Sequence, residues 1–285
     1  MTVSDAELTS LAASHDIISL GMLADDVRRR RHGTRTTFLR VANVPLAGDA
    51  APSPSPLAGE VRIAGTPASR AAAVERVAQV AAAIAGSRGV PLSGFSLADL
   101  EELSARDGVT LRALLEELRA AGLELVAEAP FDRLHDARRS IEEVNIAGLA
   151  LARLTIHQSP SPDPLPLLKA VADLQRAVAV IRAFAPLPRK VNAAVPTTGY
   201  EDVTRVALAR VIVDNIASIQ VDWSLYGPKL AQVALTVGAD DVDGVSAEDD
   251  LTEGRRRAPL EEIRRNIRAA NQDAVERNGR FDRLR

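Results

Sequence analysis

Residues 183–238 decide the fold: they read AFAPLP at 183–188, EDVTRVALARVIVDNI at 201–216, IQVDWSLY at 219–226 and KLAQVALTVG at 229–238. The first and third runs are short and apolar, whereas the second and fourth repeat apolar residues at helical spacing. Strands that alternate with helices of about 10 to 15 residues are typical of βαβ units with a parallel sheet. This stretch therefore predicts an α/β fold.

The same alternation extends towards the N-terminus. Strand patterns lie at 61–65, 123–127 and 149–156, and helix patterns at 68–85, 97–106, 111–121, 138–148 and 167–181. Ser96 and Thr110 suit the N-caps of two of these helices. Five or six such units without a dividing linker after about residue 60 predict one TIM-type (β/α) barrel domain over residues 1–285, partial or shortened. An open doubly wound sheet is the alternative, but no G-x-G-x-x-G or G-x-x-x-x-G-K-[ST] motif supports it.

The composition excludes several classes of function. The 285 residues include 35 Lys and Arg against 38 Asp and Glu, so there is no basic excess of the kind that binds nucleic acid. No apolar run approaches the roughly 20 residues of a membrane span, and the N-terminus is polar and acidic, so a cytoplasmic protein is expected. The chain contains no cysteine, which excludes disulfides, thiolate nucleophiles, cysteine-ligated zinc and thiolate-held iron–sulfur clusters.

The most site-like segment is IQVDWSLYGPKL at 219–230, which holds the only tryptophan and a carboxylate within an apolar strand pattern. If the strand continued, alternation would place Asp222 on one face with Ser224 and Tyr226. A charge in a buried strand is costly unless it is paired or functional. Both readings stay open: Asp222 faces a ligand, or it forms a structural pair with an arginine or lysine.

Three other features can be interpreted as having a structural or a functional role. The acidic residues between Asp240 and Asp250 suggest a solvated loop at the end of the barrel or, with poor calcium-loop spacing, a cation site. The cations Arg28 to Arg31 suit the last turn of a helix that Gly33 ends, or an anion site. The proline-rich loop at 44–60 fits neither a helix nor a central strand.

Beyond these patterns, two stretches resemble one enzyme family. IISLGMLADDVRRRRHGTRTTF at 17–38 is similar to the lead-in of the menaquinone-pathway radical SAM enzymes aminofutalosine synthase and dehypoxanthine futalosine cyclase. Residues 197–244, from TTGYEDV to GADDVDG, are similar to their last barrel units. VRIAG at 61–65 and ERNGRFDRL at 276–284 resemble their second strand and their tail. The resemblance covers most of the chain and implies a radical-SAM-like barrel with a helical lead-in at 1–33.

The departures from this family bear on function. Its members carry C-x-x-x-C-x-x-C after the first strand, where three thiolates hold a [4Fe–4S] cluster that binds S-adenosylmethionine. Here the loop at 44–60 replaces that cluster loop and no cysteine exists. Their G-G-G-A-E segment reads VAEAPFD here, which leaves at most Glu128 in register. The resemblance therefore implies a pseudoenzyme with no [4Fe–4S] cluster, no S-adenosylmethionine and no radical chemistry.

Two hypotheses follow from the resemblance. The leading one is a degenerate relative that binds a metabolite of menaquinone biosynthesis, or that forms a homo-oligomer or a complex with a genuine radical SAM enzyme. The alternative is a non-radical lyase or hydrolase that uses acid–base chemistry on a futalosine-like or aromatic carboxylate substrate. The implied ligand-binding residues are Asp222, Tyr226, Lys229, Asp243 and Glu248, together with His157, which ends a predicted strand. No catalytic residue and no metal ligand is assigned.

Overall fold

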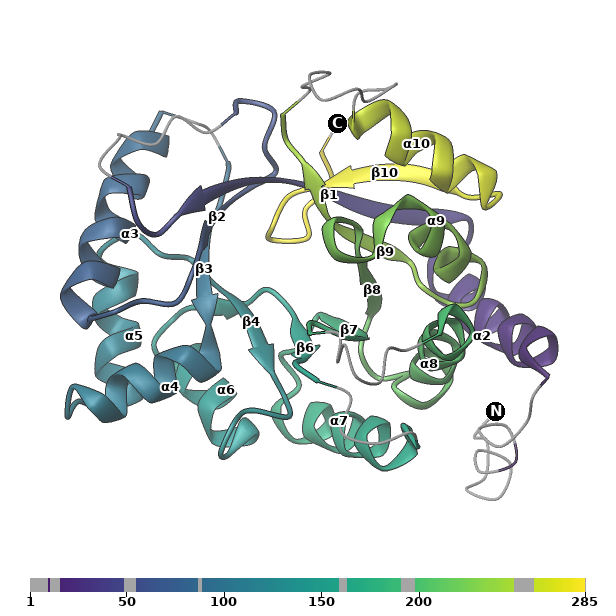
Figure 1. Ribbon diagram of the computed structural model, residues 1–285, viewed down its shortest axis with the longest axis horizontal. Coiled ribbons are helices and arrows are strands. Elements are labelled where there is room, and N and C mark those ends of the chain that lie inside the picture. The colour runs from purple at the N-terminus through teal and green to yellow at the C-terminus, as the bar shows by residue number, and fades with distance from the viewer. Residues whose placement is uncertain are drawn as a thin grey trace.

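The computed structural model describes residue 10 and residues 16–48, 55–86, 89–158, 163–190, 198–248 and 259–284. In these ranges a ring of strands is surrounded by helices (Figure 1). The strands are β1 (Arg35–Pro45), β2 (Glu60–Ala64), β3 (Leu92–Ser96), β4 (Leu125–Pro130), β5 (Ala150–Leu151), β6 (Leu154–Ile156), β7 (Ala183–Pro188), β8 (Ser218–Asp222), β9 (Asp241–Ser246) and β10 (Asp273–Arg277). The helices are α2 (Ile17–His32), α3 (Arg70–Ile84), α4 (Leu97–Arg106), α5 (Leu111–Ala120), α6 (Ala137–Ile146), α7 (Leu165–Val178), α8 (Gly199–Ile212), α9 (Trp223–Thr236) and α10 (Pro259–Ala269). None of these helices is both long and apolar enough to cross a membrane.

The ring of strands is closed. β1 to β4 follow one another, β5 and β6 share one position, and β7 to β9 complete eight parallel positions before β9 pairs with β1. The predicted TIM-type barrel is confirmed, but the expected partial ring is corrected. The physical reason is the length of β1, because its 11 residues reach both β9 and β2 and so close the gap.

Two strand boundaries also differ from expectation. β1 continues to Pro45, so the first residues of the proline-rich loop are in a strand, whereas residues 49–54 of that loop lie outside the described part of the chain. β8 ends at Asp222, and α9 begins at the next residue. The expected alternation from Asp222 to Tyr226 is therefore wrong, because the chain turns into a helix that the Asp222 carboxylate caps.

The two faces of the strands have different chemistry. In β2, Val61 and Ile63 are buried in the apolar layer between the barrel and its helices. Glu60 and Arg62 alternate with them and point into the barrel, where Arg62 reaches Asp243 of β9. The barrel interior thus carries buried charges, while the hydrophobic core lies outside it.

The amino-terminal end of the barrel is covered by the C-terminal tail. β10 pairs with the first half of β1, and the Gly279 N–H beyond it donates to the Gly59 carbonyl at 3.0 Å. Arg280 forms an ion pair with Glu124 at 2.6 Å and donates to the Gly89 carbonyl at 2.9 Å. These contacts cross from β1 towards β4, so the open end of the barrel is the carboxyl-terminal one.

Candidate functional site at the barrel mouth

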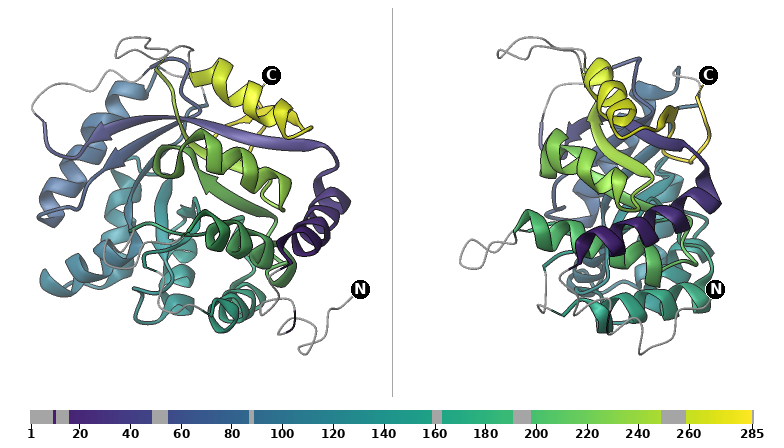
Figure 2. Two further views of the ribbon diagram at one scale, coloured as in Figure 1. Left: turned by 45° about the vertical axis from the view of Figure 1, so that its right-hand side comes forward. Right: turned by 90° about the vertical axis from the view of Figure 1, so that its right-hand side faces the viewer.

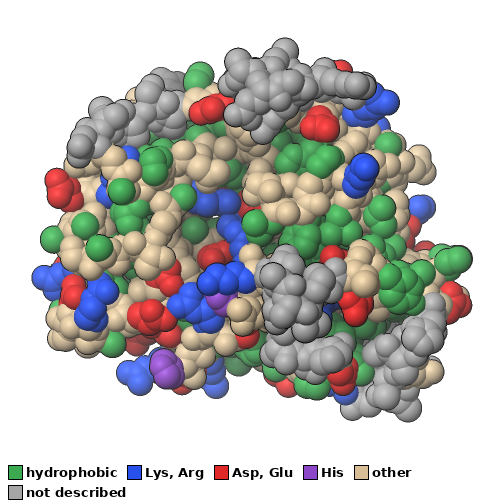
Figure 3. Space-filling model, in the orientation of Figure 1, with side chains coloured by type: hydrophobic (Ala, Val, Ile, Leu, Met, Phe, Trp, Pro, Cys, Tyr) green, Lys and Arg blue, Asp and Glu red, His purple; other side chains and the backbone are tan. Residues whose placement is uncertain are grey.

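Seven charged residues form one network inside the barrel. We call them the barrel-mouth network: Glu60, Arg62, Glu128, Arg153, Arg189, Asp222 and Asp243. They come from β2, β4, the β5–β6 and β7 positions, β8 and β9. Glu60, the first residue of β2, lies deepest, beside Gly279 of the tail, and the others lie nearer the carboxyl-terminal end. Figure 3 shows a hollow in the middle of one face, with Lys or Arg side chains on its wall and acidic side chains within it. In TIM barrels the carboxyl-terminal end is the usual place for a ligand site.

Asp243 is the centre of the network. Its carboxylate is 1 % exposed and accepts two hydrogen bonds of 3.0 Å from Arg62 and another from Arg153. Burial alone would raise the pKa of Asp243, but the charges of Arg153 and Arg62 outweigh burial and hold its pKa well below the ordinary value. Arg62 also donates to Glu60 at 2.7 Å. Asp243 is therefore a permanent anion between two buried guanidinium groups.

Asp222 links the network to helix α9. One carboxylate oxygen accepts from the backbone N–H groups of Ser224 at 2.9 Å and Leu225 at 3.1 Å, and the other accepts from Arg189 at 2.6 Å. Burial and Asp243 act to raise the pKa of Asp222, but Arg189 and Arg153 lower it overall. Of the two readings that the sequence leaves open, the observed geometry is an Asp–Arg pair.

Four buried polar atoms at one corner of the mouth have no hydrogen-bond partner among the described residues. They are Ser96 Oγ, Glu128 Oε2, Arg153 Nε and Thr155 Oγ1. Ser96 pairs with Glu128 across β3 and β4, and Thr155 faces Pro130 across β4 and β6, so the four atoms come from adjacent strands. Glu128 Oε2 lies 3.0 Å from Arg189 Nε and 4.0 Å from Arg153, without hydrogen-bond geometry. Buried polar groups are nearly always hydrogen-bonded, so this corner has unused capacity for a polar molecule or water.

Three other residues implied by the resemblance, Tyr226, Lys229 and Glu248, do not belong to the barrel-mouth network. The Tyr226 hydroxyl donates to the Pro188 carbonyl at 2.5 Å, and burial raises its pKa. Glu248 follows β9 and is exposed. Lys229 is exposed on α9 and makes no ion pair or hydrogen bond with another described residue. The structure thus brings Asp222 and Asp243 into one network, places Tyr226 beside β7, and leaves Lys229 and Glu248 outside the network.

Sequence reasoning missed most of the network. Arg62 and Arg153 are single charges within the apolar runs VRIAG and LALARLTI. That signal is the same one that singled out Asp222, and applied to every strand it would have found both arginines. Arg189 gives no such signal because it follows its strand.

His157 lies at the end of β6, as predicted. Its backbone N–H donates to Asp132 at 2.7 Å, and its carbonyl accepts from the Lys190 N–H at 2.8 Å. Burial, with the charges of Arg133 and Lys190, lowers the pKa of its imidazole.

We expect His157 to titrate below its ordinary value of about 6.5. NMR of the imidazole protons against pH, with the signal assigned from a His157→Gln variant, measures this midpoint. Lys190→Gln removes one repelling charge and should move the midpoint upwards. A midpoint at or above 6.5 in the unmodified protein would contradict the expected environment.

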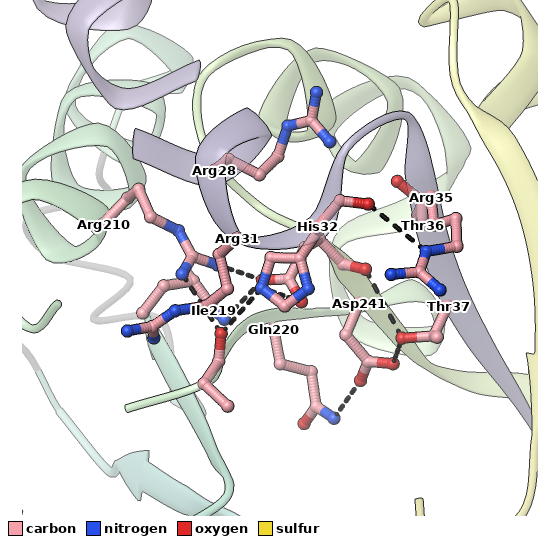
Figure 4. Close-up of polar contacts among 12 residues, drawn as sticks. Arg28, Arg31, His32, Arg35, Thr36, Thr37, Arg210, Ile219, Gln220 and Asp241 are labelled. Atoms are coloured by element: carbon pink, nitrogen blue, oxygen red, sulfur yellow. Dashed lines mark hydrogen bonds and ion pairs between the residues drawn. The ribbon is translucent and has the colours of Figure 1, made fainter. Parts of the chain in front are cut away.

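The acidic cluster is not a solvated loop where the structure describes it. Asp240 and Asp241 are buried below the mouth, around the start of β9. Asp240 pairs with Arg210 and lies 3.4 Å from His32. Asp241 accepts from Thr37 at 2.5 Å, and Figure 4 shows this pair. The expected solvated loop is wrong for these residues, because β9 carries them into the barrel wall; Asp249 and Asp250 lie outside the described residues. No group of three metal-ligating side chains occurs in the described ranges.

The arginines at the end of α2 have a structural role, as the last turn of a helix. Gly33 ends the helix, and its N–H donates to the Arg29 carbonyl at 2.8 Å. Arg28 is 1 % exposed and pairs with Asp25 at 2.9 Å. Arg31 donates to the Ile216 carbonyl at 2.7 Å (Figure 4 shows both arginines). Arg31 thus holds the helix end against the segment between α8 and β8, while Arg28 stabilises the helix end itself.

Comparison with known proteins shows which enzymes this chain is similar to in sequence. Residues 185–284 match the family model described as the CofH/MqnC C-terminal region. The chain is similar to futalosine-pathway radical SAM enzymes. It is 35 % identical over 94 residues to aminodeoxyfutalosine synthase of Streptomyces coelicolor, which is 31 % of this chain and 24 % of that protein. Against cyclic dehypoxanthine futalosine synthase of the same organism it is 26 % identical over 60 % of this chain and 47 % of that protein.

A further sequence relative and a solved structure are also similar to this chain. A 5-amino-6-(D-ribitylamino)uracil–L-tyrosine 4-hydroxyphenyl transferase of Methanosphaerula palustris is 29 % identical over 52 % of this chain and 48 % of that protein. This chain thus spans about a quarter to a half of the three relatives' own lengths. The crystal structure of methylornithine synthase covers 96 % of this chain and 95 % of its own, with a TM-score of 0.68 and 12 % identity, which is a likeness of fold alone.

The residues of this chain do not fit a [4Fe–4S] cluster. Three thiolates would have to reach the barrel mouth after β1, and the chain contains no cysteine. The mouth instead holds guanidinium groups, which carry only donors and do not ligate iron, in bonds to carboxylates.

Proposed function

We propose that this chain binds a small polar metabolite at the barrel mouth and does so without radical chemistry. The observation that carries the proposal is the corner formed by Ser96, Glu128, Arg153 and Thr155, where four buried polar atoms make no hydrogen bond, although Glu128 Oε2 forms an ion pair with Arg189. A buried donor or acceptor without a hydrogen bond costs about 1–3 kcal/mol, and a bound polar molecule would recover part of that cost. In this proposal the surrounding ion pairs fix the positions of these groups before the ligand binds.

The chemistry of the corner suggests the class of ligand. Arg153 Nε donates a hydrogen bond, the two hydroxyls can donate or accept, and Glu128 accepts. A matching ligand carries hydroxyl or amino groups next to carbonyl or carboxylate oxygens. The Methanosphaerula palustris relative is named for a ribitylamino-uracil and L-tyrosine, and both molecules have this mixture of groups. Metabolites of the futalosine pathway are the other natural candidates, given the synthases matched above.

Acid–base catalysis on such a ligand has weaker support. Asp222, the carboxylate nearest to a general base in position, already accepts hydrogen bonds from Arg189 and from the first turn of α9. Its lowered pKa makes it a poor proton acceptor near neutral pH. Binding without turnover is therefore the function that the geometry supports best.

Anaerobic reconstitution with iron and sulfide tests the radical-free part of the proposal. We expect no stoichiometric [4Fe–4S] centre, because the chain offers no thiolate. Iron and sulfide analysis together with electron paramagnetic resonance of the reduced sample measures this, and a cysteine-bearing relative carried through in parallel shows that the procedure works. One cluster per chain would overturn the proposal of a cluster-free protein.

Isothermal titration calorimetry tests the binding part. The probes are 5-amino-6-(D-ribitylamino)uracil, L-tyrosine, dehypoxanthine futalosine and aminodeoxyfutalosine. For a probe that binds, Ser96→Ala and Thr155→Val should each weaken affinity about 5- to 100-fold, because each removes one buried hydrogen-bonding group. Neither substitution should lower thermal stability, since the lost hydroxyl bonds to no described residue.

Thr236→Val is the matched control, because it removes a hydroxyl from the exposed outer side of α9. Its affinity should equal that of the unmodified protein. Affinity that is unchanged in Ser96→Ala and Thr155→Val would place the ligand elsewhere. Product analysis after long incubation with a bound probe separates binding from turnover, and a converted probe would favour the enzymatic alternative.

A further inference from the structure

An apolar groove lies on the outer side of the barrel, between α2, α8 and α9. Its volume is about 390 Å³, and it is lined mainly by Ile18, Met22, Tyr200, Val203, Val233 and Val237. In the right-hand view of Figure 2, α2 lies on the side of the molecule that faces the viewer. No residue of the barrel-mouth network lines this groove, so it is a separate feature.

The groove is bordered by apolar side chains that protrude into solvent. Ile18 is 73 % exposed and Met22 67 % exposed on α2, while Tyr200 and Val233 on the neighbouring helices are 43 % and 45 % exposed. Single exposed apolar residues are ordinary, but a contiguous group of them beside a cavity marks an interaction surface. The same patch therefore presents both apolar projections and an apolar hollow.

The charges on α2 differ between its two ends. Arg31, near the end of α2, donates to the carbonyl of Asp214, which follows α8, so the two helices run the same way. Their first turns lie together and carry the exposed carboxylates Asp16 and Glu201. The last turn of α2 carries the exposed cations Arg29, which pairs with Asp25 of the groove lining at 2.5 Å, and Arg30. The groove therefore lies between an acidic end, at the first turns of α2 and α8, and a basic end, at the last turn of α2.

We propose that this groove docks a second copy of the chain, with the two α2 helices antiparallel across a two-fold axis near Met22. A two-fold contact joins the same patch on both subunits, so it needs a surface that is complementary to itself. Here Ile18 and Met22 of each copy fill the hollow of the other, and the acidic end of each groove faces the basic end of its partner. With a rise of about 1.5 Å per residue, Asp16 and Arg29 lie about 9 and 10.5 Å on opposite sides of Met22, so an antiparallel copy brings them to the same level.

Sedimentation velocity over a range of concentrations tests the proposal. We expect a monomer–dimer equilibrium whose dissociation constant rises at least about tenfold in Met22→Asp, because the carboxylate would be buried in the apolar contact. Ile146→Asp is the matched control, since Ile146 is 58 % exposed on α6, away from the groove. A protein that stays monomeric at every concentration, or a dimer that Met22→Asp leaves unchanged, would overturn the proposal.

Cross-linking gives a second, independent readout. The chain has no cysteine, so Met22→Cys introduces its only thiol. Near a two-fold axis two such thiols lie close together, and mild oxidation should convert most of the protein to a covalent dimer. Ile146→Cys should remain monomeric under the same oxidation. Equal dimer yields from the two variants would show random collision and would contradict a two-fold axis at Met22.

Discussion

Replacing Asp243 by asparagine is expected to lower the free energy of unfolding by about 3–5 kcal/mol at neutral pH, because it leaves two buried guanidinium groups without their shared anion. Arg62 keeps its bond to Glu60, but Arg153 loses the carboxylate to which it donates. The side chain keeps its size, so the loss reports on charge rather than on packing. Chemical denaturation with a linear extrapolation measures it.

Acid pH provides a second test of the same interaction. Because the pKa of Asp243 is lowered in the folded protein, its stabilisation is present above the unfolded value of about 3.9 and is lost as the pH falls through the folded value. The stability difference between the unmodified protein and Asp243→Asn should thus be constant near neutral pH and shrink below about pH 4.

Glu248→Gln is the matched control, since it removes a carboxylate just beyond the same strand in an exposed position. We expect it to change the free energy of unfolding by less than about 0.5 kcal/mol. A loss below about 1 kcal/mol in Asp243→Asn would mean that water or bound ions compensate the two arginines.

Arg277→Met is expected to cost a similar 3–5 kcal/mol or so, this time at the covered end of the barrel. Arg277 is 2 % exposed and donates to both oxygens of Asp241 at 2.6 Å, and Asp241 is fully buried. Removing the guanidinium leaves that carboxylate with only its neutral donors, Gln220 at 2.7 Å and Thr37 at 2.5 Å. The tail that closes the barrel should then detach more easily.

A double-mutant cycle separates charge from packing at this pair. The double variant Arg277→Met/Asp241→Leu removes both charges, so it should be clearly more stable than the sum of the single losses predicts. Arg280→Met is the matched control in the same tail, because the Arg280–Glu124 pair is 37 % and 42 % exposed and should contribute about 1 kcal/mol or less. Strictly additive losses in the cycle would contradict a direct Arg277–Asp241 interaction.

Both predictions concern arginine–carboxylate pairs buried inside the barrel. Charges that a TIM barrel would usually exclude from its interior are tolerated here because arginines and carboxylates meet in pairs from strands far apart in the sequence. The arrangement leaves one corner of the mouth, around Glu128 and Arg153, incompletely bonded. The charge network and the proposed binding site are thus parts of the same interior.

Local sequence patterns were sufficient for most of the helices and for the class of fold, but they did not predict the strands β1, β3, β9 and β10. The α3, α4 and α5 helices and the β7 strand lie close to their predicted positions, and Thr110 caps α5 as its pattern indicates. Ser96 occupies the expected cap of α4, but its hydroxyl makes no capping bond and belongs to the proposed ligand corner. Closure of the ring was not predicted, because it depends on how far β1 reaches.

The sequence by itself determined that this chain, although similar to radical SAM enzymes, has no thiolate for a cluster, because a missing residue type cannot be supplied by folding. It also determined the alternation of strands and helices, which depends on neighbours a few positions apart. Only the tertiary structure decided the roles of the buried charges. Asp243 meets Arg62 and Arg153 across 181 and 90 residues of chain, and no local pattern specifies a partner at that separation. Whether a buried charge is a structural pair or an available ligand contact depends on the bonds that remain unmade after the barrel closes.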